Sequence, residues 1–470
     1  MKKILIILFL ALSFIRVSYA TNRYVSTTGS DAAAGTISAP WLTWNKAFTS
    51  TSVMAGDTVF IRGGIYELPE DATTGIDVMR AGTSGSWIVY CNYPGEVPIL
   101  DCEHADVGTG NTNMGVAMST NYGPANYIKL KGLTVRNVLQ KHNDHEVYTY
   151  GFYLENGFFT LENCTVYNSQ GWGVYSYFFN GFPVVDGAHT IINCDVHDCV
   201  NSDAAPGYMP GNGGAGFSSQ NFYGNEGHAY VRGCRAWGCG DQGFSWNGEN
   251  YCQIDSCWSF DNGRLEGGGE GFKLGWHDTD YGSPNPVVRN CIAAYNKSSG
   301  MTTNDNGMDV AEPMSIYNNT VYHNGGYGFV IYNTVDIDAD ELKRDFKNNI
   351  AYDNVSGAVF LGPSASYTHV TNSWDNPPNP TVTDADFLSV DSTGLSGPRQ
   401  SNGNLPVLNF LKLAATSDCI DVGTDVGLPK EGAGYDLGAY EYVSAEGAPA
   451  SVVKSGGKTV RHAGKTTIAK

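Results

Sequence analysis

Lys273 is the residue whose surroundings most favour chemistry, because it places one cation in a run of mostly small and apolar residues, Gly267-Gly-Gly-Glu-Gly-Phe-Lys-Leu-Gly275. The pattern of glycine, apolar residue and variable residue recurs along the chain, and most other copies carry Ser, Thr or Val at the third place. A lysine that is held neutral can remove a proton as a general base. The pattern therefore predicts Lys273 as a candidate base on a repetitive scaffold.

The variable residues are expected to form one column on the outside of the protein, because side chains alternate between the two faces of a strand. With Phe272 pointing inward, Lys273 points outward between Ser245 and Thr302, at about 5 Å from each along a stack of strands. The expected column contains Tyr175, Ser218, Ser245, Lys273, Thr302 and Val330.

Carboxylates and amides lie close in sequence to this column, among them Asp241, Gln242 and Glu270. One lysine among such groups suits β-elimination on a uronic acid polymer, in which a base removes the C5 proton next to the sugar carboxylate. That carboxylate must be neutralised, commonly by Ca²⁺ held by Asp and Glu oxygens. The expected cofactor is therefore Ca²⁺, and the expected partner is an acidic polysaccharide.

A second repeat explains how one chain of 470 residues builds this column. Short apolar segments recur at intervals of roughly 20 to 40 residues, which is typical of a solenoid of stacked coils. Each carries Cys or Asn at the same place: Cys164, Cys194, Cys234, Cys257, Cys291, Asn319 and Asn349. The pattern predicts an all-β parallel β-helix in which these residues stack as an interior ladder of small fillers. One local disulfide stays open, between Cys194 and Cys199, Cys234 and Cys239, or Cys252 and Cys257.

The ends of the chain differ from this repeat. Residues 1–20 have two lysines, an apolar run and a small-residue exit at Ser18-Tyr19-Ala20, which predicts a cleaved secretory signal. The protein is therefore expected to be secreted, periplasmic or on the cell surface, with a single β-helix domain over residues 21–442. Residues 443–470 read as a basic, flexible tail. Trp41 to Val53 reads as a short amphipathic helix that caps the solenoid.

The net charge of −19 argues against nucleic acid as a partner. No segment after residue 20 is long and apolar enough to predict a membrane span. We expect a monomer.

The chain resembles family 9 polysaccharide lyases over about residues 212 to 330. The motifs that carry the resemblance are Cys234-Arg-Ala-Trp237, Gly240-Asp-Gln-Gly-Phe244, Asp255-Ser-Cys-Trp-Ser-Phe260, Gly269-Glu-Gly-Phe-Lys-Leu-Gly275, Val288-Arg-Asn-Cys-Ile-Ala293 and Tyr317-Asn-Asn-Thr-Val-Tyr322. The resemblance implies a right-handed β-helix that acts on pectic or related polymers, with Lys273 as the Brønsted base.

The calcium site that the resemblance implies matches in part. Its aspartates fall at Asp241, Gln242 and Ser245, and a fourth falls at Ala215. Three alternatives follow: the ion is rebuilt with Glu226, Glu249 or Glu270, the substrate carboxylate is neutralised by Arg235, Arg264 or Arg289, or activity is lost. The expected metal ligands are Asp241, Gln242, Ser245 and Glu270, and the expected substrate-binding residues are Arg235, Arg264, Arg289, Trp276, His277 and Asn304.

Two other functions stay open from the residues alone. A β-helix glycoside hydrolase would use Asp241 and Glu270 as a carboxylate pair. A non-catalytic carbohydrate-binding surface protein would stack sugars on exposed aromatic side chains, for which the candidates are Tyr175, Tyr177, Trp246, Trp258 and Trp276.

Overall fold

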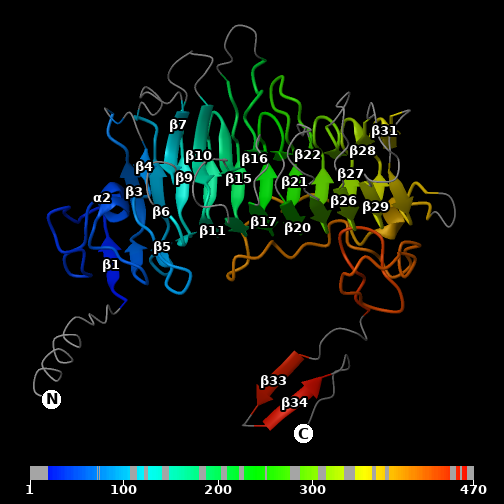
Figure 1. Ribbon diagram of the computed structural model, residues 1–470. Coiled ribbons are helices and arrows are strands. Elements are labelled where there is room, and N and C mark those ends of the chain that lie inside the picture. Colours follow the sequence, from blue (N-terminus) through cyan, green and yellow to red (C-terminus); the bar gives the residue numbers. More distant parts are fainter. Residues whose placement is uncertain are drawn as a thin grey trace, which may run out of the picture.

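The fold is a stack of short parallel strands in three sheets, as the computed structural model shows (Figure 1). The described residues are 20–70, 72, 75–105, 114–120, 125–139, 148–178, 187–202, 209–221, 227–248, 251–275, 286–304, 314–332, 344–362, 367–375, 380–444, 451–455 and 458–462. Successive coils add strands to the same three sheets, and neighbouring strands within each of these sheets pair in parallel. The predicted parallel β-helix is therefore confirmed.

The first sheet has twelve strands in the described part of the chain. In stacking order they are β1 (Asn22–Val25), β2 (Thr58–Ile61), β5 (Ile88–Asn92), β8 (Ile128–Lys131), β11 (Phe158–Glu162), β14 (Ala188–Ile192), β17 (His228–Arg232), β20 (Tyr251–Asp255), β23 (Val287–Arg289), β26 (Met314–Tyr317), β29 (Arg344–Lys347) and β32 (Thr368–Val370).

The second and third sheets have ten described strands each. The second contains β4 (Ile76–Asp77), β7 (Met114–Ser119), β10 (Tyr148–Glu155), β13 (Trp172–Tyr177), β16 (Phe217–Asn221), β19 (Phe244–Gly248), β22 (Phe272–Leu274), β25 (Met301–Thr302), β28 (Tyr327–Ile331) and β31 (Gly357–Leu361). The third contains β3 (Gly64–Glu67), β6 (Pro98–Asp101), β9 (Thr134–Arg136), β12 (Thr165–Tyr167), β15 (Asp195–His197), β18 (Arg235–Trp237), β21 (Trp258–Phe260), β24 (Ile292–Ala294), β27 (Thr320–Tyr322) and β30 (Ile350–Tyr352).

The predicted interior ladder is present and joins consecutive coils. The backbone N–H of Cys257 donates to Sγ of Cys291 at 3.4 Å, and that of Cys291 donates to Oδ1 of Asn319 at 3.0 Å. Asn319 donates from its backbone and its amide to Oδ1 of Asn349, both at 3.0 Å. All eleven cysteines are buried and free, so none of the three local disulfides forms.

The Asn that precedes most ladder residues has a backbone cause, and Gly233 and Ser256 take its place before Cys234 and Cys257. The residue before the ladder residue turns the chain from the first sheet to the third in the left-handed region, which Asn tolerates better than most residues. Asn290 and Asn318 show this with φ of 54° and 51°. The first residue of the pair therefore makes the turn and the second makes the ladder.

A second ladder, which the sequence analysis missed, runs five residues after the first. The N–H of Cys239 donates to Asn262 Oδ1 at 3.1 Å, and the N–H groups of Asn262 and Asn296 each donate to the Asn of the next coil. The signal was in the sequence, because the pairs Cys234/Cys239, Cys257/Asn262 and Cys291/Asn296 share one spacing.

The N-terminal end of the stack is covered by α2 (Trp44–Thr49), which is shorter than the predicted helix over Trp41 to Val53. Thr43 caps it by accepting from the N–H of Lys46 at 3.1 Å. Trp44 and Phe48 are buried, and the Phe48 ring stacks on Tyr90 of β5 at 4.0 Å between centroids. The amphipathic pattern therefore identified the cap, and the extended backbone of Thr43 and Ser50 sets its ends.

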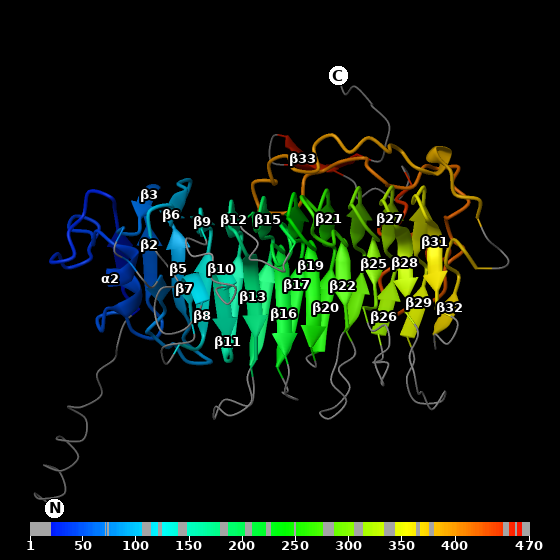
Figure 2. The same ribbon diagram turned by 90° about the horizontal axis from the view of Figure 1, so that it is seen from above.

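Residues 380–444 run along the outer face of the third sheet (Figure 2). This segment includes the 3₁₀ turn η1 (Asp384–Asp386) and buries Phe387, Leu395 and Phe410 against β21, β24 and β27. In the tail, β33 (Ser451–Ser455) and β34 (Lys458–His462) pair as an antiparallel hairpin. The predicted signal at residues 1–20 lies outside the described residues except for Ala20, and no described helix is long and apolar enough to cross a membrane.

Candidate active site

Lys273 occupies the predicted place in the predicted column. In the second sheet it pairs in register with Ser245 of β19 and Thr302 of β25. Phe272 and Leu274 on either side of it are 0% and 1% exposed, whereas Lys273 is half-buried. The column continues on one side through Ser218 and Tyr175 and on the other through Val330. Because its two apolar neighbours point into the core and side chains alternate along a strand, Lys273 points outward.

The glycine before each inward apolar residue is required by close packing at a corner of the coil. A Cβ on Gly271 would lie 2.6 Å from the carbonyl oxygen of Gly300 and 2.9 Å from the Cβ of Ala293. A Cβ on Gly243 would lie 2.0 Å from Oγ of Ser259. The recurring glycines thus let the second sheet approach the third and fix where each strand of the column begins.

Asp241, Gln242 and Glu270 form a connected group beside this column. Gln242 donates from Nε2 to Oδ1 of Asp241 at 2.6 Å and to Oε2 of Glu270 at 3.1 Å. The backbone N–H groups of Gly213 and Gly268 also donate to Asp241, at 3.1 and 2.9 Å. Asp241 and Gln242 are buried, and Glu270 is half-buried.

The electrostatics of Asp241 tie this group to the lysine. Burial raises the pKa of Asp241 above its ordinary value. The N–H groups of Gly213 and Gly268 and the charge of Lys273 act in the opposite direction, and the charge of Glu270 raises the pKa further. Lys273 and the two carboxyl groups therefore share one electrostatic neighbourhood.

Hydroxyl and amide groups complete the face on either side of Lys273. Ser245 is buried and accepts from the amide of Asn247 at 3.2 Å. Thr302 is also buried, and its Oγ1 accepts from the backbone N–H of Asn304 at 3.2 Å. The structure thus brings the predicted residues Asn304 and Ser245 to the coils next to the lysine.

Tyr332 is a member of this face that the sequence analysis missed. Its side chain bonds to that of Thr302, and burial and the charge of Glu270 raise the pKa of its phenol. It lies two residues after Val330, so it belongs to the next outward position of its strand and not to the column. Extending the alternation by one more outward residue would have found it.

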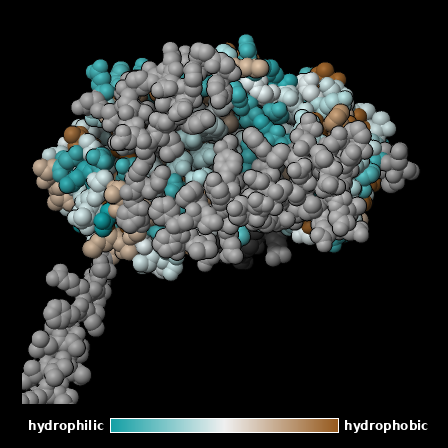
Figure 3. Space-filling view, turned by 45° about the horizontal axis from the view of Figure 1, so that its top comes forward, coloured by the Kyte–Doolittle hydropathy of each residue, from teal (hydrophilic) through white to brown (hydrophobic). Residues whose placement is uncertain are grey.

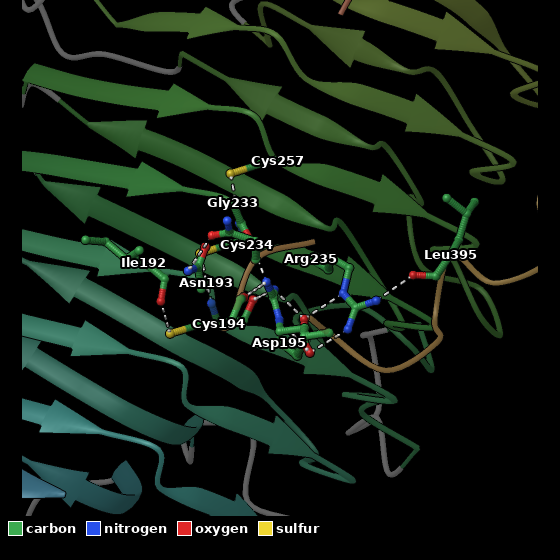
Figure 4. A network of polar contacts seen from close by, with 12 residues as sticks. Ile192, Asn193, Cys194, Asp195, Gly233, Cys234, Arg235, Cys257 and Leu395 are labelled. Atoms are coloured by element: carbon green, nitrogen blue, oxygen red, sulfur yellow. Dashed lines mark hydrogen bonds and ion pairs between the residues drawn. The ribbon is translucent and has the colours of Figure 1, made fainter. Parts of the chain in front are cut away.

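The three arginines predicted to bind substrate lie on other faces. Arg289 belongs to the first sheet and pairs with Asp255, and Arg264 pairs with Asp198 at the edge of the third sheet. Arg235 is only 2% exposed and binds Asp195 and the carbonyls of the C-terminal segment (Figure 4). The structure therefore does not bring these three arginines to Lys273, and it gives Arg235 a structural role.

Two of the predicted sugar-stacking tryptophans are buried. Trp246 is 3% exposed because it follows Phe244 by two residues and points into the solenoid core. Trp258 is 3% exposed because the C-terminal segment covers the third sheet. Tyr175 is 5% exposed and packs among Tyr150, Tyr153 and Trp172. Trp276 and His277, together with Glu226 and Glu249, lie outside the described residues.

The described groups beside Lys273 do not fit a calcium ion. Within the described ranges, no cluster of three or more His, Cys, Asp or Glu side chains could hold a metal. Calcium takes six to eight oxygen ligands. Here a nitrogen of Gln242 lies between the only two carboxylates of the group, and the hydroxyl of Ser245 is bonded to Asn247. Ala215 is buried and supplies no ligand.

Comparisons with known proteins agree with the fold. The chain matches the family described as Pel9A-like, right handed beta helix region, over residues 23–349. Pectate lyase L of Dickeya chrysanthemi is 26% identical over 439 residues, which cover 89% of this chain and 90% of that protein. Pectate lyase PEL9 of Emericella nidulans is 27% identical over 439 residues, covering 86% and 95%.

Two solved structures, each under 25% identical, support the fold. That of pectate lyase Pel9A superposes with a TM-score of 0.67 at 23% identity and covers 91% of this chain and 97% of the other. That of a rhamnogalacturonan lyase superposes with a TM-score of 0.70 at 24% identity and covers 84% and 97%.

The curated relatives and the family match place the protein among the polysaccharide lyases, which break carbon–oxygen bonds. Within that class the chain belongs to the Pel9A-like right-handed β-helix family, whose match spans well over half of its length. The predicted family, fold and enzyme class are confirmed. The relatives therefore favour the lyase over the two alternatives, which were a glycoside hydrolase and a non-catalytic binding protein.

Proposed function

We propose that this protein cleaves a uronic-acid-containing polysaccharide of the pectate or rhamnogalacturonan kind by β-elimination, with Lys273 as the Brønsted base. The observation that supports the proposal is the register of the second sheet, in which Lys273 is the one cation among the described residues of the outward column, between Ser245 and Thr302. The names of the relatives, pectate lyase and rhamnogalacturonan lyase, support this substrate class. The described surface in Figure 3 is mainly hydrophilic or intermediate, which suits a polar polymer.

In the proposed reaction, neutral Lys273 removes the proton at C5 of the uronic acid. The electron pair of the broken C–H bond forms the C4–C5 double bond, and the bond between C4 and its glycosidic oxygen breaks. The ammonium formed on Lys273 then lies next to the negative charge that develops on the substrate. The leaving oxygen needs a proton, and a candidate donor on the described part of this face is the phenol of Tyr332, which is half-buried and bonded to Thr302.

Export belongs to the same proposal. A polymer of this kind does not enter a cell, so its lyase acts outside the cytoplasm. The apolar run and small-residue exit of residues 1–20 predict the signal for that export. A protein found only in the cytoplasm of its host would contradict this part of the proposal.

The ultraviolet absorbance of the unsaturated uronide product tests the reaction directly. Wild type is assayed on a panel of pectic and other uronic acid polymers beside Lys273→Ala, with Lys131→Ala as the matched control. Lys131 lies in the first sheet and is 42% exposed at its side chain, so its loss leaves the face of the second sheet intact.

We expect Lys273→Ala to lower the rate by at least about 10²-fold, as loss of a positioned base does. Lys131→Ala should keep the wild-type rate. Equal rates for wild type and Lys273→Ala on every polymer that wild type degrades would refute Lys273 as the base.

A further inference from the structure

The amide of Gln242 lies where a cation would have to lie to bridge Asp241 and Glu270. Its Nε2 atom is 2.6 Å from one carboxylate and 3.1 Å from the other. The orientation of the amide follows from these partners, because its oxygen would face two acceptors whereas its nitrogen supplies two donors. A neutral group therefore makes both of the contacts that a bridging ion would make.

Two more acceptor positions of Asp241 are taken by backbone donors. Gly268 donates to the same oxygen as Gln242, and Gly213 donates to the other oxygen. Asp241 is 6% exposed and Gln242 4%, so these bonds form away from water. Inside a protein, buried polar groups that have their partners are costly to rearrange. Binding of an ion here would require the Gln242 amide to turn over and both of its hydrogen bonds to break.

We propose that Gln242 keeps calcium out of this site, and that the elimination proposed above runs without a bound metal ion. The part of this inference that concerns catalysis rests on the proposed function. The exclusion of calcium does not, because it is a binding property of the folded chain. Gln242 acts on the charge near Lys273 and not on the position of the lysine, which the burial of Phe272 and Leu274 fixes. It holds Asp241 and Glu270 together in the turns that lead into β19 and β22, the strands that carry Ser245 and Lys273.

Calcium binding is measured first, by titration calorimetry with CaCl₂ and by the melting temperature of the full chain in CaCl₂ and in EDTA. The variants are Gln242→Asp and the double variant Gln242→Asp/Ser245→Asp. The matched control is Gln253→Asp, which adds the same carboxylate in β20 of the first sheet. Each variant is included only if its circular dichroism matches that of wild type, and the single variant serves if the double variant does not fold.

We expect no saturable calcium uptake by wild type or by Gln253→Asp, and the same melting temperature in CaCl₂ and in EDTA. Gln242→Asp should take up one calcium ion per chain, and its melting temperature should rise with CaCl₂, because a ligand that binds only the folded state stabilises it. Saturable binding by wild type, or equal calcium uptake by Gln242→Asp and Gln253→Asp, would overturn the inference.

Turnover separates this inference from the proposed function. We expect the uronide absorbance of wild type to rise at the same rate with and without EDTA. A rate that EDTA abolishes and CaCl₂ restores would overturn metal-independent catalysis and leave the lyase reaction standing. Absence of product from wild type under every condition would refute the proposed reaction, and the calorimetry would still decide whether calcium is excluded.

Discussion

Replacement of Arg235 by leucine separates a structural role from a role in substrate binding. In the structure, Arg235 donates from Nε and Nη2 to the two oxygens of Asp195 at 2.8 and 2.7 Å, and from Nη1 to the carbonyls of Leu395 and Gly397 at 2.7 and 2.8 Å (Figure 4). Arg399 binds the same carboxylate at 2.6 and 3.0 Å. Burial alone would raise the pKa of Asp195, but the two guanidinium groups outweigh it and hold that pKa below its ordinary value.

The expected cost follows from these contacts. Breaking a buried ion pair costs about 3–5 kcal/mol, and because Asp195 keeps Arg399 as a partner we expect about 3 kcal/mol for Arg235→Leu. At roughly 2.1 cal/mol/K per residue, a β-helix of about 420 residues has an unfolding entropy near 0.9 kcal/mol/K, so this cost lowers Tm by about 3 °C. The C-terminal segment should also become easier to cleave by a protease, because Arg235 binds two of its carbonyls.

The assay compares Tm, limited proteolysis and the KM for the polymer that wild type degrades. Arg289→Leu is the matched control, because Arg289 binds one oxygen of Asp255 in the first sheet and Asp255 keeps Ser256 and Asn290 as partners, so its loss should cost less than that of Arg235. We expect Arg235→Leu to have a lower Tm and an unchanged KM. An unchanged Tm with a raised KM would refute the structural role and restore Arg235 as a substrate-binding residue.

Two further predictions concern the interior. Burial lowers the pKa of His189 to about 3, whereas the pKa of histidine in the unfolded chain is near 6.5. Below about pH 6 the unfolded state therefore binds more protons than the folded state. The free energy of unfolding should then fall by about 1.4 kcal/mol for each pH unit. Between pH 6 and pH 4, the free energy of unfolding measured with urea should change less steeply with pH in His189→Gln than in wild type, by about that amount, and equal slopes would contradict this account. In the ladder, Asn349→Ala should lower the free energy of unfolding by about 3 kcal/mol or more, because the backbone N–H and the amide of Asn319 lose their acceptor. Asn349→Cys should lower it less. Equal urea midpoints for the two Asn349 variants would contradict that account of the ladder.

The sequence was informative wherever a residue's surroundings are set by its own coil and the next. Lys273 was placed in register because the glycine corner and the inward Phe272 recur in each coil, and the ladder was found because its members repeat at one place in the coil. Trp246 was misjudged although the same alternation puts it on the inward face with Phe244. These properties are local, so spacing and alternation predict them.

Contacts between distant segments were not predictable in this way. Arg235 meets Leu395 across 160 residues, and nothing in the repeat around Arg235 indicates that a later segment covers the third sheet. Trp258 is buried by that same segment. The bridge made by Gln242 joins turns 28 residues apart, and the sequence supplied its residues without showing that the amide nitrogen lies between the carboxylates.

The division between inward and outward residues also explains why the position of Lys273 does not depend on which groups occupy the turn before β19. Lys273 is held by the burial of Phe272 and Leu274 and by the close packing of Gly271, and none of these contacts involves Asp241 or Gln242. The ladders that hold the coils in register are likewise interior. Replacement of a carboxylate by an amide in the turn before β19 therefore changes the charge near the lysine and leaves its position unchanged. If Lys273 is the base, as proposed, its geometry does not depend on an ion at Asp241, and the ammonium formed on Lys273 can itself meet the charge that develops on the substrate.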